Sequence, residues 1–245
     1  MVSVLGIPFT NLTAMEVFQE SKKFLHGQTP RVIITAGPEF VMQTITDPTL
    51  AAIVQKADLV TPDGIGIVIA SKWYGTPLKE RVTGVELAPH LISYAAEAGL
   101  RVYILGASED ALRGALGNLR AQHPSLRIDG QNGYFSEEET STVLQGIRDF
   151  APHLLLVGLG QPRQDRFIDR YRQELGVPLS IGVGGTIDVL AGRVKRAPRI
   201  VQKAKMEWFY RLCREPRRFR RQLALPAFAW RAWRDAAAIR AAHQR

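Results

Sequence analysis

Short runs of β-branched and apolar residues alternate along the chain with longer segments in which apolar residues recur every three or four positions. The short runs predict strands and the longer segments predict amphipathic helices. We expect strands at 31–35, 59–61, 101–105, 126–129, 154–157 and 179–183. The clearest helices are expected at 86–98, 109–122, 137–150 and 163–174, with a further apolar helix beginning near Gly66.

Strand and helix follow each other about five or six times, which predicts the α/β class: a Rossmann-like, mainly parallel sheet with helices on both faces. The helix at 137–150 is expected to open with a capping box, because Ser136 precedes Glu139 by three positions. In such folds the ligand binds beyond the carboxyl ends of the strands. The loops that follow the strands are therefore where chemistry is expected.

Length and composition favour one globular domain with an appendage. The chain has 245 residues and 46% hydrophobic content, enough for a sizeable core. It contains no run of about 18 apolar residues and no signal-peptide pattern at its start, so we expect a cytoplasmic location. A single cysteine, Cys213, argues against an intrachain disulfide and a thiolate metal cluster.

The C-terminal segment 193–245 differs sharply from the rest in charge. It carries sixteen Lys or Arg and three Asp or Glu, a net +13, so residues 1–192 sum to −4 in a chain of +9. We assign 1–192 to the α/β domain and 193–245 to a basic helical appendage, which Pro198, Pro216 and Pro226 are expected to divide into short helices, since proline ends a helix or lies in its first turn. The appendage is also aromatic, with Trp208, Phe209, Phe219, Phe228, Trp230 and Trp233.

A basic and aromatic surface suits either an anionic membrane or a nucleic acid. The first interpretation is peripheral association with an anionic membrane surface. The alternative is a nucleic-acid-binding protein that uses this tail along a phosphate backbone, although no RNP, KH or helix-turn-helix signature supports it. A third interpretation is a plain charged surface whose aromatic residues belong to the core.

Two of the strand-end loops carry groups that a phosphate-bearing or polyhydroxy ligand needs. In the loop 35–39, Thr35 ends a strand and Gly37 permits close backbone approach. In the loop 61–66, Asp63 stands between a strand and a helix. Asp63 either caps that helix or acts as a general base at the edge of the sheet.

Two later loops join a strand to a helix through glycines, at 158–165 and 182–188. Their spacing matches neither the dinucleotide fingerprint nor a Walker loop, so no nucleotide cofactor is assigned. Asp188 either holds ribose hydroxyls or caps a helix. Because no His-Cys cluster or Asp-x-Asp pair is present, we expect no metal and no cofactor. Arg81 is then the candidate to neutralise a diphosphate, unless it is a simple surface arginine.

Five segments together, in this order, resemble the WecG/TagA/CpsF glycosyltransferases over about residues 32–221. The segments are Thr61-Pro62-Asp63-Gly64-Ile65-Gly66, Arg81-Val82-Thr83-Gly84-Val85-Glu86-Leu87, Gly158-Leu159-Gly160-Gln161-Pro162-Arg163-Gln164-Asp165, Gly182-Val183-Gly184-Gly185 and Glu207-Trp208-Phe209-Tyr210-Arg211-Leu212.

The resemblance implies an inverting, metal-independent enzyme that moves a sugar from a UDP-sugar to a polyprenyl-diphosphate-linked sugar. Such enzymes build teichoic acid, common antigen or exopolysaccharide, and some form homo-oligomers. The resemblance also implies peripheral association with the inner face of the bacterial plasma membrane. By motif, Asp63 matches the proposed catalytic base and Thr35 the active-site threonine. The implied substrate contacts are Arg81, Gln164, Tyr134, Asp188, Gly184 and Gly185, with the tail arginines Arg211, Arg214, Arg217, Arg218 and Arg221 closing over the site at the membrane.

The chain departs from the family pattern at two positions. Many members read Thr-x-Asn-Pro-Glu where this chain has Gly37 in place of asparagine, which removes an amide from the expected site. We therefore expect a donor such as UDP-glucose or UDP-glucuronate as an alternative to an N-acetylated sugar. The family's Pro-x-Gln-Glu here ends in Asp165, which keeps the carboxylate on a shorter side chain.

Overall fold

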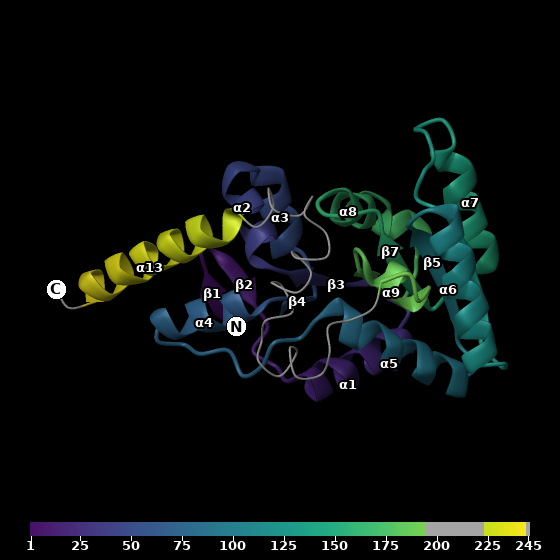
Figure 1. The fold of residues 1–245 in the computed structure, drawn as a ribbon, viewed down its shortest axis with the longest axis horizontal. Helices are drawn as coiled ribbons and strands as arrows, with labels where there is room; N and C mark the ends of the chain where they lie inside the picture. The colour runs from purple at the N-terminus through teal and green to yellow at the C-terminus, as the bar shows by residue number, and fades with distance from the viewer. Residues whose placement is uncertain (195–222, 244–245) are drawn as a thin grey trace.

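The computed structural model describes residues 1–194 and 223–243. Its centre is a sheet of six parallel strands in the order β4-β3-β8-β7-β5-β6 (Figure 1). The expected α/β fold is thus confirmed, and each expected strand is present within one or two residues of its predicted ends. The strands are β3 (Arg31–Ala36), β4 (Leu59–Pro62), β5 (Arg101–Gly106), β6 (Arg127–Gln131), β7 (Leu154–Gly158) and β8 (Leu179–Gly182).

Helices cover both faces of the sheet, as expected. One face carries α2 (Pro38–Thr46), α3 (Pro48–Gln55), α4 (Ile65–Trp73), α7 (Thr140–Phe150) and α8 (Arg163–Leu175). The other face carries α1 (Ala14–Leu25), α5 (Gly84–Glu97), α6 (Glu109–Gln122) and α9 (Thr186–Leu190). Two separate clusters of buried apolar side chains result, one under each helical layer.

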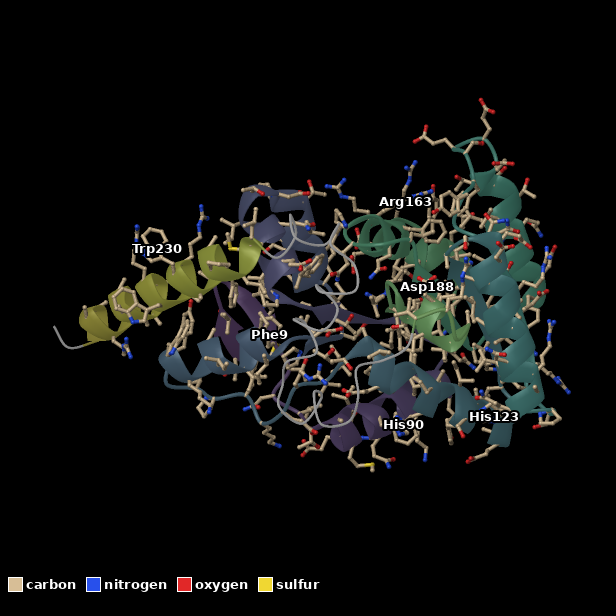
Figure 2. All side chains as sticks on the ribbon, viewed as in Figure 1. Phe9, His90, His123, Arg163, Asp188 and Trp230 are labelled. Carbon is tan, nitrogen blue, oxygen red and sulfur yellow. The ribbon has the colours of Figure 1, made fainter. Side chains whose placement is uncertain are left out.

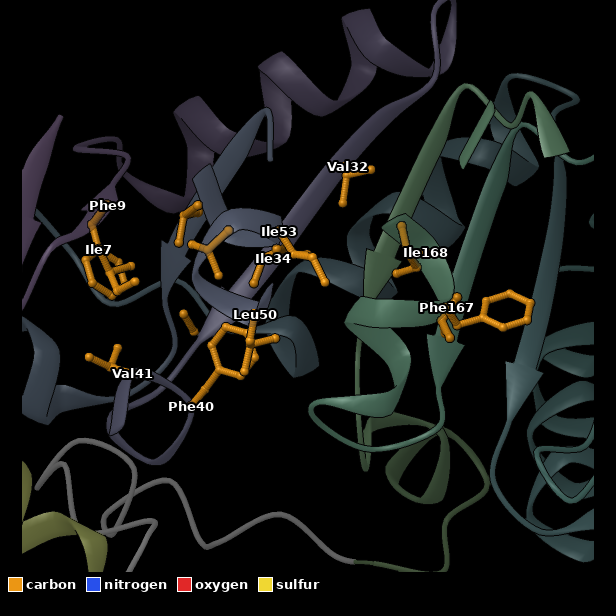
Figure 3. Packing of buried hydrophobic residues seen from close by; sticks show 14 of the residues in the cluster. Ile7, Phe9, Val32, Ile34, Phe40, Val41, Leu50, Ile53, Phe167 and Ile168 are labelled. Carbon is orange, nitrogen blue, oxygen red and sulfur yellow. The ribbon is translucent and has the colours of Figure 1, made fainter. Parts of the chain in front are cut away.

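Alternation along the strands produces these two clusters. On β3, Val32 and Ile34 face α2 and α3, while Ile33 faces the opposite layer. Figure 3 shows Ile34 close to Phe40 and Leu50, which come from α2 and α3. Each such side chain contributes about 1.5–3 kcal/mol when fully buried. Because β3 is buried on both faces, it forms a fixed base for the loop that follows it.

The predicted start of α7 was three residues too early. The capping box is formed, since the Ser136 amide donates to the Glu139 carboxylate at 2.7 Å and the Glu139 amide donates to Ser136 Oγ at 3.3 Å. However, residues 137–139 form a turn, and the α-helix begins at Thr140.

A short antiparallel hairpin of β1 (Val2–Val4) and β2 (Ile7–Phe9) precedes the first helix. Its two turn residues, Leu5 and Gly6, have positive φ angles of 51° and 79°. The four strand ends Val2, Val4, Ile7 and Phe9 are buried in the same cluster as β3 and α4. The hairpin therefore extends the core beside β4.

The described part of the C-terminal segment is one long helix, α13 (Ala224–His243). Pro226 lies in the first turn of α13, as expected of a proline that opens a helix, but at 20 residues α13 is longer than the short helices expected. Pro198 and Pro216 lie outside the described residues. Phe228 and Ala232 of α13 belong to the cluster that contains β3, and the Tyr74 hydroxyl donates to Asp235 at 2.8 Å.

The helix α13 thus packs on α2 and α4 and lies at the opposite end of the molecule from α6 and α7 (Figure 1). Across residues 1–194 and 223–243, no helix has both the length and the hydropathy needed to cross a membrane.

Candidate active site

The strand order creates a crevice at the carboxyl edge of the sheet. β3 and β8 are neighbours, but the chain leaves β3 toward α2 on one face and leaves β8 toward α9 on the other. Loops that separate in this way leave an opening where α/β proteins bind ligands. A cavity of about 760 Å³ lies there. Its polar lining includes Thr35, Asp63, Arg81, Thr83, Gln161, Gln164, Gly184, Gly185 and Asp188.

Thr35 is fixed at the end of β3 by two hydrogen bonds. Its hydroxyl donates to the carbonyl oxygen of Gly182 on β8 at 3.1 Å, and its own carbonyl oxygen accepts from the Gln161 side chain at 3.0 Å. Only 6% of Thr35 is exposed. A hydroxyl that donates one hydrogen bond still has acceptor capacity. Thr35 therefore presents a rigid acceptor to the cavity.

Asp63 lies one residue beyond β4 and is held at both backbone and side chain. Its amide donates to the Ala36 carbonyl at 3.0 Å, and its Oδ2 accepts from the Gly84 amide at 3.4 Å. Gly84 is the first residue of α5. The alternative that Asp63 caps the helix after it is not what the structure shows, because Gly64 occupies that position. The carboxylate instead lies at the start of α5, where a helix favours negative charge.

The glycine at position 37 allows the loop after β3 to approach the loop after β4. A Cβ atom on Gly37 would lie only 2.7 Å from the carbonyl oxygen of Asp63. An asparagine carries the same Cβ atom, so Gly37→Asn in this chain would require the two loops to separate. The departure from the family pattern therefore affects the position of Asp63 as well as the chemistry of the site.

Gln164 forms part of the floor of the cavity. It is 1% exposed, and its Oε1 accepts from the Gly184 amide at 3.1 Å. The helix α8 comes this close to β8 because Gly182 has no side chain: a Cβ atom there would lie 2.7 Å from Gln164 Nε2. Gly184 itself has a φ of 51°, which favours glycine. Gln164 thus fixes the shape of the loop after β8.

The next residue, Asp165, is buried behind the cavity. It is 2% exposed, and neither carboxyl oxygen has a hydrogen-bond donor among the described residues. Burial without a compensating donor disfavours the charged form and raises the pKa of Asp165 to about 7. Asp165, which stands where the family pattern has a longer glutamate, is therefore a buried acid. It is not among the residues that line the cavity.

Arg81 lines the cavity from the loop between α4 and α5. Its guanidinium pairs with Glu86 at 3.1 Å, and Glu86 also accepts from the Thr83 hydroxyl at 2.8 Å. The amide of the next residue, Val82, donates to the Pro62 carbonyl at 3.1 Å, which holds this loop beside Asp63. Arg81 has a side chain that is 27% exposed, so it is a partly buried, oriented cation.

The remaining predicted residues are placed less uniformly. Asp188 lines the cavity from α9, and the N-cap of that helix is Gly185, so the alternative that Asp188 caps the helix does not hold (Figure 2). Tyr134 is 81% exposed and is not among the lining residues. Its contact with a nucleotide stays a prediction. The predicted tail contacts lie outside the described residues: Arg211, Arg214, Arg217, Arg218 and Arg221.

Sequence reasoning missed the apolar wall of the cavity. Part of it comes from α4, where Ile65, Ile69 and Trp73 recur every fourth residue and so share one side of the helix. A second part comes from the start of α13, namely Leu225, Phe228 and Ala229. The spacing in α4 was readable in the sequence, but the neighbour across the cavity was not.

Within 1–194 and 223–243, no group of three or more His, Cys, Asp or Glu side chains is arranged to hold a metal ion. The cationic group that lines the cavity in these ranges is Arg81.

Comparison with known proteins places this site in a family. A model of the glycosyl transferase WecG/TagA/CpsF family matches residues 2–242. An N-acetylglucosaminyldiphosphoundecaprenol N-acetyl-β-D-mannosaminyltransferase from Bacillus subtilis (strain 168) is 31% identical over 93% of this chain and 89% of its own length.

Proteins of the same name are similar in two further organisms. The one from Bacillus spizizenii is 34% identical over 80% of this chain and 76% of its own, and the one from Staphylococcus aureus (strain MW2) is 31% identical over 94% and 91%. The chain, with its cavity between β3 and β8, therefore belongs to the WecG/TagA/CpsF family of glycosyltransferases.

Proposed function

We propose that this protein transfers a sugar from a UDP-sugar to N-acetylglucosamine linked to a polyprenyl diphosphate, with inversion and without a divalent metal. The named relatives support the acceptor, since their name describes an N-acetylglucosaminyl-diphosphoundecaprenol. The observation that carries the proposal is the arrangement of Asp63, Thr35 and Arg81 around one cavity. A carboxylate, a hydroxyl and a cation are the groups that a metal-free displacement needs.

In the proposed reaction the acceptor hydroxyl attacks the anomeric carbon of the donor. The new bond joins the acceptor oxygen to that carbon, the bond to the UDP oxygen breaks, and Asp63 takes the hydroxyl proton. General-base catalysis of this kind typically contributes about 10²–10⁴ in rate. Asp63 suits the role because it lines the cavity at the carboxyl edge of the sheet and its Oδ2 accepts from the Gly84 amide at 3.4 Å.

Arg81 would stabilise the charge that develops on the departing diphosphate. A preoriented cation at a developing charge is worth more than a mobile one, and Glu86 orients Arg81 at 3.1 Å. Thr35 would accept a hydrogen bond from a sugar hydroxyl, because its own hydrogen is committed to Gly182. The tail arginines at 211, 214 and 221 remain proposed contributors to the same charge.

The donor sugar remains the open part of the proposal. The names of the relatives point to N-acetylmannosamine. Gly37 stands in place of the asparagine of the family pattern. UDP-glucose and UDP-glucuronate are therefore candidate donors beside UDP-N-acetylmannosamine.

The test is UDP release from a panel of these donors, with an N-acetylglucosaminyl-diphosphate acceptor carrying a short prenyl chain present or absent. Release that depends on the acceptor, occurs with one donor and persists in EDTA would support the transfer, the donor and the absence of a metal. Acceptor-dependent release that EDTA abolishes would remove the metal-free mechanism, and no release with any donor would remove the reaction.

The proposal includes peripheral attachment to the inner face of the membrane. Figure 2 shows Trp230 projecting from α13, well apart from Asp188. Trp230 and Trp233 are 56% and 53% exposed, and the Arg234 guanidinium lies 4.8 Å from the Trp230 ring. Exposed tryptophans beside arginines suit the headgroup region of an anionic bilayer. Phe228 is buried and belongs to the core, as the third interpretation of the tail expects. The helix α13 therefore carries both core and exposed aromatic residues.

A further inference from the structure

The cavity has two unlike halves. One half is polar and contains Asp63, Arg81, Gln164 and Asp188. The other half is apolar, and its walls include α4 and α13. A sugar nucleotide and a sugar diphosphate are both strongly polar, so the polar half suits them. The apolar half requires a different part of a ligand.

The α4 side of the apolar half begins directly at the proposed catalytic residue. Ile65 follows Asp63 by two positions, and Ile69 and Trp73 continue the same side of the helix. From Ile65 to Trp73 the helix rises about 12 Å, at 1.5 Å for each of the eight steps between them. Ile69 is 44% exposed although it lines a cavity in a well-packed domain. An isoleucine exposed in this way is a candidate for contact with an apolar ligand.

The α13 side runs alongside α4 in the same direction. Phe228 Cε1 lies 3.9 Å from the position that a Cβ on Gly66 would take, near the start of α4. At the other end, Asp235 accepts from Tyr74, which directly follows α4. The two helices therefore form a trough, with Leu225, Phe228 and Ala229 on its α13 side. The exposed Trp233 lies one helical turn beyond Ala229.

We propose that this trough, lined by Ile65, Ile69, Trp73, Leu225, Phe228 and Ala229, binds the first part of the isoprenoid chain of the acceptor. The inference rests on the proposed function, because it takes the acceptor to be a polyprenyl diphosphate sugar. The trough adjoins the half that contains Arg81, so one ligand with a diphosphate head and a hydrocarbon tail fits both halves. The tail then leaves the protein near Trp233, on the helix proposed to touch the membrane.

The test compares binding of two probes by calorimetry: farnesyl diphosphate, which has the head and a short isoprenoid, and ethyl diphosphate, which has the head alone. The wild type is expected to bind farnesyl diphosphate at least about tenfold more tightly, because burial of apolar carbon favours binding. Ile69→Asn is expected to reduce this ratio to about threefold or less. Ala229→Gln is a second variant on the opposite wall and is expected to act in the same direction.

Ile45→Asn is the matched control. Ile45 is 39% exposed on α2 and is not among the residues that line the cavity, so its replacement is expected to leave the ratio at the wild-type value. Circular dichroism of each variant shows that it is folded.

The outcomes separate the trough from the reaction. Equal binding of the two probes by the wild type, or an unchanged ratio in both trough variants, would overturn the trough even if sugar transfer is observed. Binding of sodium myristate as tight as that of farnesyl diphosphate would also overturn it, because the occupant would then be any acyl chain. If the preference for farnesyl diphosphate over ethyl diphosphate falls in the trough variants but the wild type transfers no sugar, the trough is supported and the proposed function is rejected.

Discussion

Gly37→Ala tests whether the position of Asp63 depends on the close approach of two loops. The added Cβ atom would lie 2.7 Å from the Asp63 carbonyl oxygen, whereas ordinary contacts begin near 3.4 Å. The two loops must therefore separate by about 0.7 Å. The Asp63 peptide is also held by the Ala36 carbonyl at 3.0 Å, so the shift is carried by the residue that bears the proposed base.

A misplacement near 1 Å in an active site costs up to about 10²-fold in rate. We therefore expect kcat to fall by about 10- to 100-fold, equivalent to about 1.4–2.7 kcal/mol of activation free energy. The KM for the donor is expected to change less, because Arg81 and Gln164 come from other segments, the α4–α5 loop and α8. Overpacking is expected to lower the free energy of unfolding by about 1–3 kcal/mol.

The assay is steady-state UDP release at varied donor concentration, with urea unfolding of the same samples. Gly117→Ala is the control, because Gly117 lies within α6 and a Cβ there has nothing within 4 Å. That change is expected to leave kcat unaltered and to stabilise the helix by about 0.5–1 kcal/mol. A Gly37→Ala enzyme with the wild-type kcat would refute the argument that this contact positions Asp63.

Three further predictions concern the buried acid and the C-terminal helix. Burial raises the pKa of Asp165 from 3.8 to about 7, so as pH rises through this range the carboxyl ionises first in the unfolded state and the folded state loses stability. Between pH 5 and pH 8, the free energy of unfolding of the wild type in urea should fall by roughly 3 kcal/mol more than that of Asp165→Asn. A wild type and variant with parallel pH profiles would contradict this. Tyr74→Phe removes the donor to Asp235 and the acceptor of the Leu5 amide, and should lower the unfolding free energy by about 1 kcal/mol in the same assay; the loss should be smaller when Asp235 is already alanine. Replacing Trp230 and Trp233 with alanine should reduce sedimentation of the protein with anionic vesicles. About 0.5 M salt should reduce sedimentation of the wild type. Vesicle binding that is unchanged by both the substitutions and the salt would argue against attachment through α13.

Strand-end chemistry was the part of the site that could be predicted from the sequence. Apolar runs gave the strands, and in a parallel sheet all carboxyl ends meet at one edge, so Thr35, Asp63 and Asp188 were expected near one another. The alternative roles of Asp63 and Asp188 as helix caps could not be resolved in this way, because each stands close to a helix start. Only the backbone geometry shows that Gly64 and Gly185 occupy the capping positions.

Other features depend on contacts between distant segments. The buried state of Asp165 follows from the absence of a side chain at Gly182, on another element. The trough exists because α13 packs beside α4, and nothing in the spacing of α13 alone identifies that neighbour. The N-terminal hairpin was not predicted, although its sequence carries a signal. Val2, Val4, Ile7 and Phe9 alternate with other residues, but the two strands have only three residues each.

The most direct test of the central claim is detection of the lipid-linked disaccharide itself by mass spectrometry. Purified protein would be incubated with the donor selected by UDP release and with farnesyl-diphosphate-linked N-acetylglucosamine. The wild type should form disaccharide and UDP in equal amounts, and folded Asp63→Asn should form both about 10²–10⁴ times more slowly. UDP release without disaccharide, or Asp63→Asn with the wild-type rate, would contradict the account.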